Sequence, residues 1–428
     1  MTIRCFCSCA LYELRSLTTH ICAIRPYSPQ ISKLEHNKLI FSKVPTLRFK
    51  RYTTEWTKIN LSNYLCVSSK RNKDGRFSKE DVLSVSGELG IVNQIALLGR
   101  SYAGESVLPY HIVEKGDIVY TKSPLALYPY GIIKTNRNKV GIVSTLYAVY
   151  KTKDNANNRF IEHYFSLKSR INNYLKPIVR IGAKHDMKIG NNEVLENIVA
   201  FPDISEQCEI ADFLDLLDNR ISVQNKIISD LKVLKKELCN KVFGKGSAVR
   251  LGDFIEEVTT RNKSNSCENV LSVSNKMGFI KQSEQFEDRT VASENKSNYK
   301  VVTEGCFAYN PARINVGSIA LLSTYKIGII SPMYVCFKTK SNLNSEYLNF
   351  YYQSGFFYKE LQKKLEGSVR QCLTYENMSE ILIPYVGIEE QKAIAVTLNK
   401  FATLIATEEK YIKSLQKQKS YFLNAMFI

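Results

Sequence analysis

The sequence repeats itself in tandem, and this duplication constrains the possible folds more than any other feature. The segment VLSVSGELGIVNQ (82–94) aligns without a gap with VLSVSNKMGFIKQ (270–282), 188 positions later. Flanking segments repeat at nearly the same offset, such as YHIVEKGDIVY (110–120) with YKVVTEGCFAY (299–309), and GIVSTLYAVYKTK (141–153) with GIISPMYVCFKTK (328–340). The chain therefore holds two copies of one domain.

Each copy combines strand and helix patterns. Short runs rich in Val, Ile, Tyr and Phe are broken by Gly, Asn and Ser, which is typical of strands and turns. The segments 158–167 and 345–354 have the apolar spacing of equivalent amphipathic helices. The sequence predicts a mixed α/β (α+β) fold for both copies, and 428 residues are too many for one ordinary core.

A long helical segment follows each copy, over 202–243 and 384–428. Pro202 and Pro384 stand just before the Glu-Gln pairs at 206–207 and 390–391, where a helix can begin. Apolar residues then recur at alternating spacings of four and three, as in a coiled coil. This seam comprises Ile210, Leu214, Leu217, Ile221, Ile228, Leu231, Leu238 and Val242 in the first segment, and Ile394, Leu398, Phe401, Ile405, Ile412, Leu415, Phe422 and Met426 in the second.

The two helices are expected to pair with each other, the alternative being that each lies on its own domain. Polar residues interrupt both seams at equivalent places, Gln224 and Lys235 in the first and Glu408 and Lys419 in the second. A polar residue inside a coiled coil can fix its register, so we predict this role for them. The alternative is that these side chains are simply solvated.

The charge balance favours a polyanionic partner. The net charge is +18, and residues 44–201 carry 24 Lys and Arg against 13 Asp and Glu, whereas residues 244–383 carry 17 against 14. Such an excess suits nucleic acid or an anionic membrane surface. No run approaches the roughly 18 apolar residues of a membrane span, so a membrane partner is not expected.

Chemistry-bearing motifs are missing from the sequence. The 11 cysteines show no paired CxxC spacing, which argues against a zinc site and is typical of reduced thiols in a cytoplasm. GKGS (244–247) lacks the spacing of a nucleotide-binding loop, and YNPA (309–312) is expected to be a loop. We therefore expect no catalysis, metal or cofactor in this chain, and treat residues 1–43 as an extension of unknown value.

The order of domain, helix, domain, helix resembles the specificity subunit of type I restriction–modification enzymes. The resemblance covers about residues 44–428 and rests on VPTLRF (44–49) with Glu55-Trp56, on EQCEIADFLDLLDNRI (206–221), on EEQKAIAVTLNKF (389–401), and on SPMYVCF (331–337). The second helix departs from the first at Thr397 and Ala402, which stand where the first has Phe213 and Asp218. That difference weakens any expectation of identical pairing geometry.

The resemblance implies two target recognition domains, 44–201 and 244–383, each of which reads one half of a bipartite double-stranded DNA site. The helices would form an antiparallel coiled coil that spaces the domains. Modification subunits carrying S-adenosylmethionine would dock near them, and restriction subunits would join. Two other classes stay open, namely a coiled-coil scaffold whose domains bind protein, and a DNA methyltransferase.

Candidate DNA contacts are basic and amide side chains on predicted loops, because phosphates attract cations and base edges pair with Arg, Asn, Gln and Lys. Both copies contain the tripeptide RNK, at 71–73 and 261–263, whose alternative role is a solvated surface turn. The candidates are Lys70, Arg71, Lys73, Arg76, Ser86, Lys122, Lys134, Arg137, Arg180 and Lys184 in the first domain, and Arg261, Asn262, Lys263, Asn275, Lys276, Asn310, Arg313, Asn315, Arg370 and Gln371 in the second.

Overall fold

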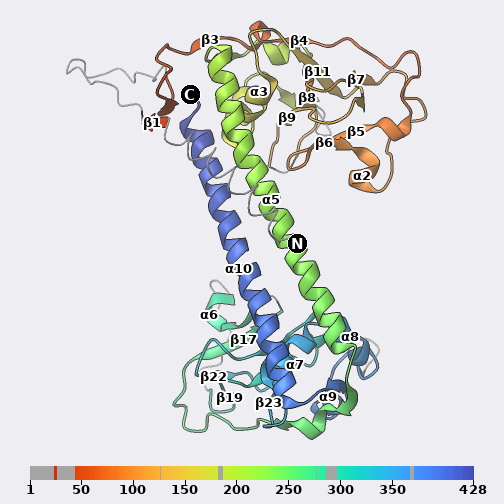
Figure 1. Ribbon diagram of the computed structural model, residues 1–428, viewed down its shortest axis with the longest axis vertical. Helices are drawn as coiled ribbons and strands as arrows, with labels where there is room; N and C mark the ends of the chain where they lie inside the picture. Colours follow the sequence, from red (N-terminus) through yellow and green to blue (C-terminus); the bar gives the residue numbers. More distant parts are fainter. Residues whose placement is uncertain are drawn as a thin grey trace, which may run out of the picture. The chain divides into compact units, whose positions relative to one another are not determined.

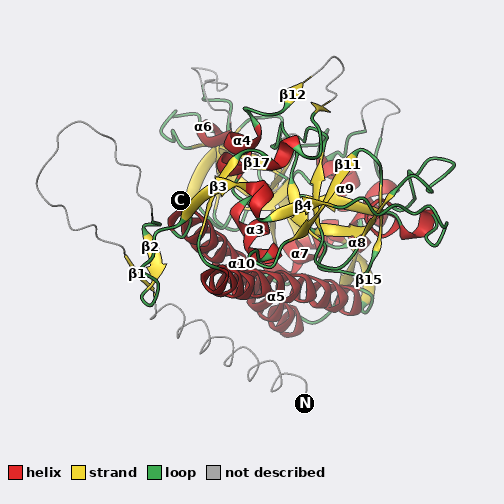
Figure 2. Ribbon diagram, turned by 90° about the horizontal axis from the view of Figure 1, so that it is seen from above, coloured by secondary structure: helices red, strands yellow, loops and turns green. Residues whose placement is uncertain are grey.

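The computed structural model describes residues 24–26, 44–125, 127–181, 187–275, 277–285, 296–366 and 371–428. The chain divides into two compact units, which are unit 1 (Met1–Val223 with Ile412–Ile428) and unit 2 (Gln224–Tyr411). Both contain strands and helices (Figures 1 and 2). The expected extension over 1–43 lies outside the described residues except for β1 (Ile24–Pro26), which pairs with β2 (Leu47–Phe49).

Unit 1 is built on an antiparallel sheet with the strand order β4-β11-β8-β9. These strands are β4 (Leu65–Val67), β11 (Tyr147–Thr152), β8 (Ile118–Thr121) and β9 (Ile133–Thr135). Beside it lie three strand pairs, β5 (Leu83–Ser86) with β6 (Gly90–Asn93), β7 (His111–Val113) with β10 (Gly141–Val143), and β3 (Thr57–Asn60) with β14 (Ile198–Phe201). The short strands β12 (Arg180–Ile181) and β13 (Met187–Lys188) also pair.

Unit 2 repeats the main features of this arrangement. Its main sheet has the order β16-β23-β20-β21, from β16 (Ile255–Glu257), β23 (Val335–Thr339), β20 (Phe307–Tyr309) and β21 (Ile319–Leu321). A second sheet has the order β18-β17-β22-β19, from β18 (Gly278–Lys281), β17 (Val270–Ser274), β22 (Ile327–Ile330) and β19 (Lys300–Thr303), and β15 (Ser247–Arg250) pairs with β24 (Leu382–Tyr385). The predicted duplication of a mixed α and β fold is confirmed.

The repeated VLSVS segments are equivalent strands, β5 and β17, but their neighbours differ slightly. In unit 2, β17 pairs in parallel with β22 and so joins two hairpins into one sheet. In unit 1 only an isolated parallel bridge, Val82 to Ile142, connects the corresponding β5 and β10. The two parallel strands of each unit therefore run in the same direction and end at the same edge.

Short helices pack on both units. The predicted equivalent helices are α3 (Asn158–Tyr164) and α7 (Ser345–Tyr352), each begun by an asparagine whose side chain accepts a backbone N–H of the first turn. The others are α2 (Gln94–Leu98), α4 (Lys168–Leu175), α6 (Gln282–Gln285), α8 (Gly355–Gln362) and α9 (Tyr375–Ser379). Buried aromatic residues fill the cores, among them Trp56, Phe160, Phe201 and Phe427 in unit 1.

The predicted long helices are α5 (Ile204–Phe243) and α10 (Ile388–Ala425). In unit 1 the first half of α5 lies beside the end of α10, since the rings of Phe213 and Phe422 are 4.8 Å apart and Asp218 forms an ion pair with Lys419. In unit 2 the second half of α5 lies beside α10 (Figure 1), where Lys232 Nζ is 2.6 Å from Glu409 Oε1. Both pairings are antiparallel, as expected.

The residues of the predicted seam are all buried or half-buried. Ile210, Leu214, Leu217, Ile228, Leu398, Ile405, Ile412, Leu415 and Met426 are buried, and Ile221, Leu231, Leu238, Val242, Ile394, Phe401 and Phe422 are half-buried. The polar seam residues are engaged rather than merely solvated. Gln224 donates a hydrogen bond to Glu408, Lys419 pairs with Asp218, and the ammonium group of Lys235 lies 5.0 Å from the centre of the Phe350 ring.

A buried glutamine at the start of each long helix bonds that helix to the mixed α and β part of its own unit. Gln207 accepts the backbone N–H of Asn157 (2.9 Å) and donates to the carbonyls of Asn155 and Pro202 (3.1 and 2.9 Å). Gln391 accepts the N–H of Asn344 (2.8 Å) and likewise donates to two backbone carbonyls. The repeated Glu-Gln pair in the sequence thus marks the joint between helix and domain, because the glutamine satisfies buried backbone groups.

Phe213 on α5 and Thr397 on α10 differ because the segment that contains β2 covers α5 in unit 1. Residues of this segment cover the start of α5, where the Phe49 ring packs edge-on against Phe213 at 6.2 Å and Arg48 forms a buried ion pair with Glu206. On α10 the equivalent Thr397 is exposed. A large apolar residue is therefore useful at the first position and would be costly at the second.

Candidate nucleic-acid interface

The RNK tripeptides lie on equivalent loops that extend a sheet edge. In unit 1 the chain leaves β4 and runs antiparallel to β7, with hydrogen bonds from Ile112 N–H to Lys70 O (3.1 Å) and from Asn72 N–H to Tyr110 O (3.0 Å). In unit 2 the corresponding bonds are Val301 N–H to Thr260 O (2.8 Å) and Asn262 N–H to Tyr299 O (2.9 Å). Both loops are thus fixed to the sheet by the same backbone pairing.

The asparagine of each tripeptide shapes its loop from within. Asn72 accepts the N–H of Phe77 (3.0 Å) and donates to its carbonyl (2.8 Å), and Asn262 makes the same two bonds with Cys267 (3.2 and 3.0 Å). Both side chains are buried. The structure thus places the Asn262 amide inside the loop, and its predicted contact with DNA is untested.

The arginine of each tripeptide fixes its loop to the residues just before β7 in unit 1 and β19 in unit 2. Arg71 donates to the carbonyl of Pro109 (2.7 Å), and Arg261 donates to that of Asn298 (2.9 Å). Lys70 pairs with Glu114 at 2.7 Å. Lys73 and Lys263 are exposed, and neither forms an ion pair with another described residue. Arg76 is exposed above the Phe77 ring. These three exposed cations are accessible to a phosphate.

The topology brings these loops to the same edge as the turns after the VLSVS strands. The bridge between Arg71 and His111 puts the first loop at the start of β7, which pairs with the end of β10. In unit 2, Arg261 bridges Lys300, which pairs with Ile330 at the end of β22. Strands β5 and β17 end at these edges too. In each unit, the loop with the RNK tripeptide therefore lies at the same edge as the turns that follow the parallel strands. We call this the loop edge, formed by 72–76, 87–89 and 144–146 in unit 1, and by 262–266, 275, 277 and 331–333 in unit 2.

In unit 2 a further loop joins this edge. Asn275 donates to the carbonyl of Val316 (3.4 Å), which holds the turn after β17 against the loop 310–317. Arg313 and Asn315 are exposed on that loop, whereas Asn310 accepts the N–H of Ala312 and so shapes it. In unit 1, Ser86 has a comparable local role, because its hydroxyl oxygen accepts the N–H groups of Glu88 and Leu89.

Burial also perturbs one ionisable group at the loop edge of unit 1. His111 is buried, and its Nδ1 has no hydrogen-bond partner among the described residues. Burial, together with the smaller effect of the nearby Arg71 and Lys122 charges, lowers the pKa of His111 to about 4. The imidazole is therefore neutral at physiological pH and contributes no charge to the edge.

Three predicted cations of unit 1 are engaged elsewhere. Lys122 donates to Ile189 O (2.9 Å) and Asn191 Oδ1 (2.6 Å), and burial lowers its pKa. Lys134 and Arg137 both pair with Glu162 on α3, and Arg137 also pairs with Asp215 on α5. The structure thus places the charged groups of these three residues on partners within unit 1, and their contact with DNA stays a prediction.

The remaining candidates lie apart or outside the described residues. Arg180 is exposed and lines an open hollow with Lys188 and Glu193, and Gln371 is exposed at the end of a loop. Lys184, Lys276 and Arg370 fall outside the described residues. The sequence analysis did not select four exposed apolar residues at the loop edges, namely Leu89, Leu146, Met277 and Met333. An isolated apolar residue in a strand-rich pattern looks like part of the core.

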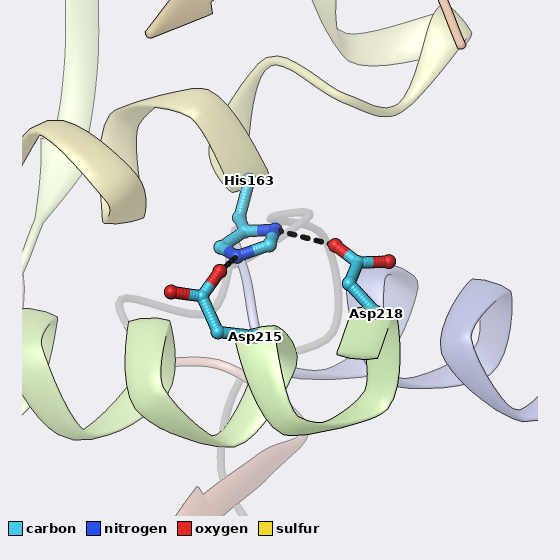
Figure 3. A group of neighbouring side chains, drawn as sticks. All are labelled: His163, Asp215 and Asp218. Atoms are coloured by element: carbon cyan, nitrogen blue, oxygen red, sulfur yellow. Dashed lines mark hydrogen bonds and ion pairs between the residues drawn. The ribbon is translucent and has the colours of Figure 1, made fainter. Parts of the chain in front are cut away.

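One cluster in unit 1 has the composition of a metal site. His163, Asp215 and Asp218 have ligand atoms within 4.8 Å of one another, and His163 Nε2 lies 2.9 Å from Asp215 Oδ1 (Figure 3). Burial alone would raise the pKa of Asp215, but the hydrogen bond from His163 and the Arg137 guanidinium outweigh it and hold that pKa well below its ordinary value. Arg137, Arg159 and Lys419 already neutralise these carboxylates, so the cluster is an ion-pair network that joins α3 to α5.

Comparisons with known proteins show the family of this chain. Residues 109–233 and 247–417 match the family described as the type I restriction modification DNA specificity domain. The chain is 26% identical over 275 residues to the type I restriction enzyme MjaVIII specificity subunit of Methanocaldococcus jannaschii, covering 55% of this chain and 63% of that protein. It is 25% identical over 266 residues to the putative MjaX specificity subunit of the same organism, covering 57% and 61%. The chain thus spans about three-fifths of these relatives.

A solved structure shares the fold. The crystal structure of the type I restriction–modification system S subunit from M. genitalium matches with a TM-score of 0.57 and 12% identity, over 90% of this chain and 99% of that one. None of the helices in the described part of the chain combines the length and apolar character that a membrane span needs.

Proposed function

Because this chain belongs to the type I restriction modification DNA specificity domain family, we propose that it is the subunit that gives such a complex its DNA sequence specificity. Each unit binds one half of a bipartite site in double-stranded DNA through its loop edge. The exposed cations Lys73 and Arg76 in unit 1, and Lys263 and Arg313 in unit 2, face the phosphates. Neighbouring turn residues face the bases.

The observation that carries this proposal is the same loop edge built twice with different residues. The strands that support the turns are alike, and both copies spell VLSVS. Directly after them the first copy has Gly-Glu-Leu and the second has Asn-Lys-Met. Two different half-sites require different contact residues on one common scaffold, which is this pattern.

The chain acts without chemistry of its own in this proposal. Modification subunits supply methyl transfer from S-adenosylmethionine and dock near the paired helices and the recognition domains. Restriction subunits join where the system has them. The complex works in the cytoplasm, where it meets the cell's DNA.

A domain exchange tests the modular assignment. Replacing residues 250–383 by the corresponding domain of another specificity subunit should change one half of the methylated sequence and leave the other half intact. Sequencing of methylation patterns in cells that carry the original and the exchanged chain measures both halves. A change in both halves would contradict the assignment of one half-site to each unit.

Two further measurements separate the alternatives. Loss of a bipartite methylation motif when this chain is deleted supports the specificity role, whereas an unchanged motif favours a protein-binding scaffold. Methyl transfer by the purified chain alone, assayed with labelled S-adenosylmethionine, would favour a methyltransferase.

A further inference from the structure

Both loop edges carry large apolar side chains that are exposed to solvent at equivalent positions. In the turn after the VLSVS strand, Leu89 is 61% exposed in unit 1 and Met277 is 73% exposed in unit 2. In the turn after the neighbouring parallel strand, Leu146 and Met333 are each 61% exposed. We call these four residues the apolar tips. The duplication aligns them in pairs, so the same unfavourable exposure occurs twice.

The turns hold these tips in defined positions. Ser86 Oγ accepts the N–H of Leu89 (3.2 Å), and Ser274 Oγ accepts the N–H of Met277 (3.4 Å). Gly90 and Gly278 follow directly, with φ of +71° and +68°, a left-handed conformation that glycine adopts without strain. The two hairpin tips are therefore presented in the same way.

The second pair is held by an equivalent turn. Tyr147 N–H bonds to Ser144 O (3.0 Å), and Tyr334 N–H bonds to Ser331 O (3.1 Å). Leu146 and Met333 each occupy the position before that tyrosine. Because β5 with β10, and β17 with β22, run in parallel, the two tips of each unit emerge from the same edge of the sheet.

The neighbours of the tips changed between the two copies, but the apolar character did not. Thr145 stands where the second copy has Pro332, and Glu88 stands where it has a lysine. Turn tips ordinarily carry polar residues, and an exposed apolar side chain gains nothing in the free chain. Exposed apolar character is therefore what the two copies share at these positions.

The charges beside the tips indicate which partner they meet. On the loop edge of unit 1, Lys73 and Arg76 lie beside the exposed acidic residues Asp74 and Glu88. Lys263 and Arg313 lie at the loop edge of unit 2. Single apolar side chains set among cations suit DNA, where cations meet phosphates while apolar groups touch thymine methyl groups or unstacked base steps. Resting on the proposed function, we propose that the apolar tips contact the bases of each half-site directly.

Paired substitutions in the complete complex with modification subunits test this proposal. The variants are Leu89→Ala with Leu146→Ala, and Met277→Ala with Met333→Ala. Matched controls are Ile198→Ala on β14, and Ile327→Ala at the opposite end of β22, which truncate exposed apolar residues away from the loop edges. Conservative variants, Leu89→Met and Met277→Leu, keep the apolar contact.

Binding is measured on the bipartite site identified from methylation patterns, and on DNA in which one half is scrambled. Each alanine pair should weaken binding to the intact site by on the order of tenfold, from lost apolar contact. Unit 1 variants should lose discrimination at one half-site and unit 2 variants at the other. The salt dependence should not change, because no phosphate contact is lost. The controls and conservative variants should bind like the original chain.

Three results would overturn the proposal in distinguishable ways. If the original complex does not distinguish the intact from the scrambled site, the proposed function itself fails. If it does, but the alanine pairs match the controls, then the tips do not contact bases. If the alanine pairs fail to assemble with modification subunits in the absence of DNA while the controls assemble, the tips contact protein instead.

Discussion

The buried ion pair between Arg48 and Glu206 offers a sharp test of how the segment around β2 stabilises unit 1. Arg48 Nε and Nη2 each lie 2.7 Å from a carboxylate oxygen of Glu206, and the side chains are 4% and 1% exposed. Replacing Glu206 by Gln keeps the shape but leaves the guanidinium charge buried without its partner. Removing one partner of such a pair costs about 3–5 kcal/mol.

A neighbouring pair on the same two segments provides the control. Arg51 Nη2 lies 2.5 Å from Glu209 Oε2, but the Arg51 side chain is 67% exposed. Solvent screens this second pair, so Glu209→Gln should change stability little. The comparison isolates burial, because both pairs join an arginine near β2 to a glutamate in the first turns of α5.

The only tryptophan makes the measurement specific to unit 1. Trp56 is buried in that core, with ring centres 6.1 Å from Phe160 and 6.3 Å from Phe427. Urea unfolding followed by its fluorescence should show a midpoint lowered by about 1–2 M in Glu206→Gln, given a slope of roughly 2–3 kcal/mol per molar urea. Arg48→Met with Glu206→Leu should recover much of the loss, since an apolar pair avoids the desolvation cost.

The reasoning would be refuted if Glu206→Gln shifted the midpoint no more than Glu209→Gln. It would equally fail if the double apolar variant were as unstable as Glu206→Gln, because the defect would then lie in packing rather than in an unpaired charge.

Three other predictions follow from the described contacts. Lys73→Ala with Arg76→Ala should weaken DNA binding by the assembled complex and reduce the slope of log affinity against log salt by about 1.8, which titration of binding at several salt concentrations measures; an unchanged slope would remove these cations from the interface. Gln224→Leu with Glu408→Leu should loosen the register of the helix pair, visible as lower unfolding cooperativity and poorer assembly with modification subunits; unaltered assembly would show that the polar contact does not set the register. His111 has a folded pKa of about 4 and an unfolded pKa near 6.5, so unit 1 should lose stability as pH falls from about 6.5 to 4, by at most about 1.4 kcal/mol per pH unit; Trp56 fluorescence in urea should show this loss, and His111→Leu should reduce it.

Much of the fold could be predicted because the sequence states it in local patterns and then repeats them. The 4,3-spaced seam and the offset of the two copies required two equivalent domains and two pairing helices. The sequence could not predict in the same way which strands end at the same edge of a sheet. The convergence of Arg71, Ser86 and Leu146 at one edge depends on the parallel alignment of β5 and β10, which pairs segments far apart in the chain.

The sequence by itself determined the duplication, the helix seam and the basic character, because each is carried by residue type and spacing. Only the tertiary structure decided which polar side chains are available to a partner. In the sequence, Lys122 and Arg137 look like Lys73 and Arg76. In the structure, Lys122 and Arg137 bond to partners inside unit 1, whereas Lys73 and Arg76 remain exposed. The burial of Asn262 and Gln207 and the exposure of Leu89 could not be predicted from the sequence either. Burial and pairing depend on how the chain packs and not on the residue type alone.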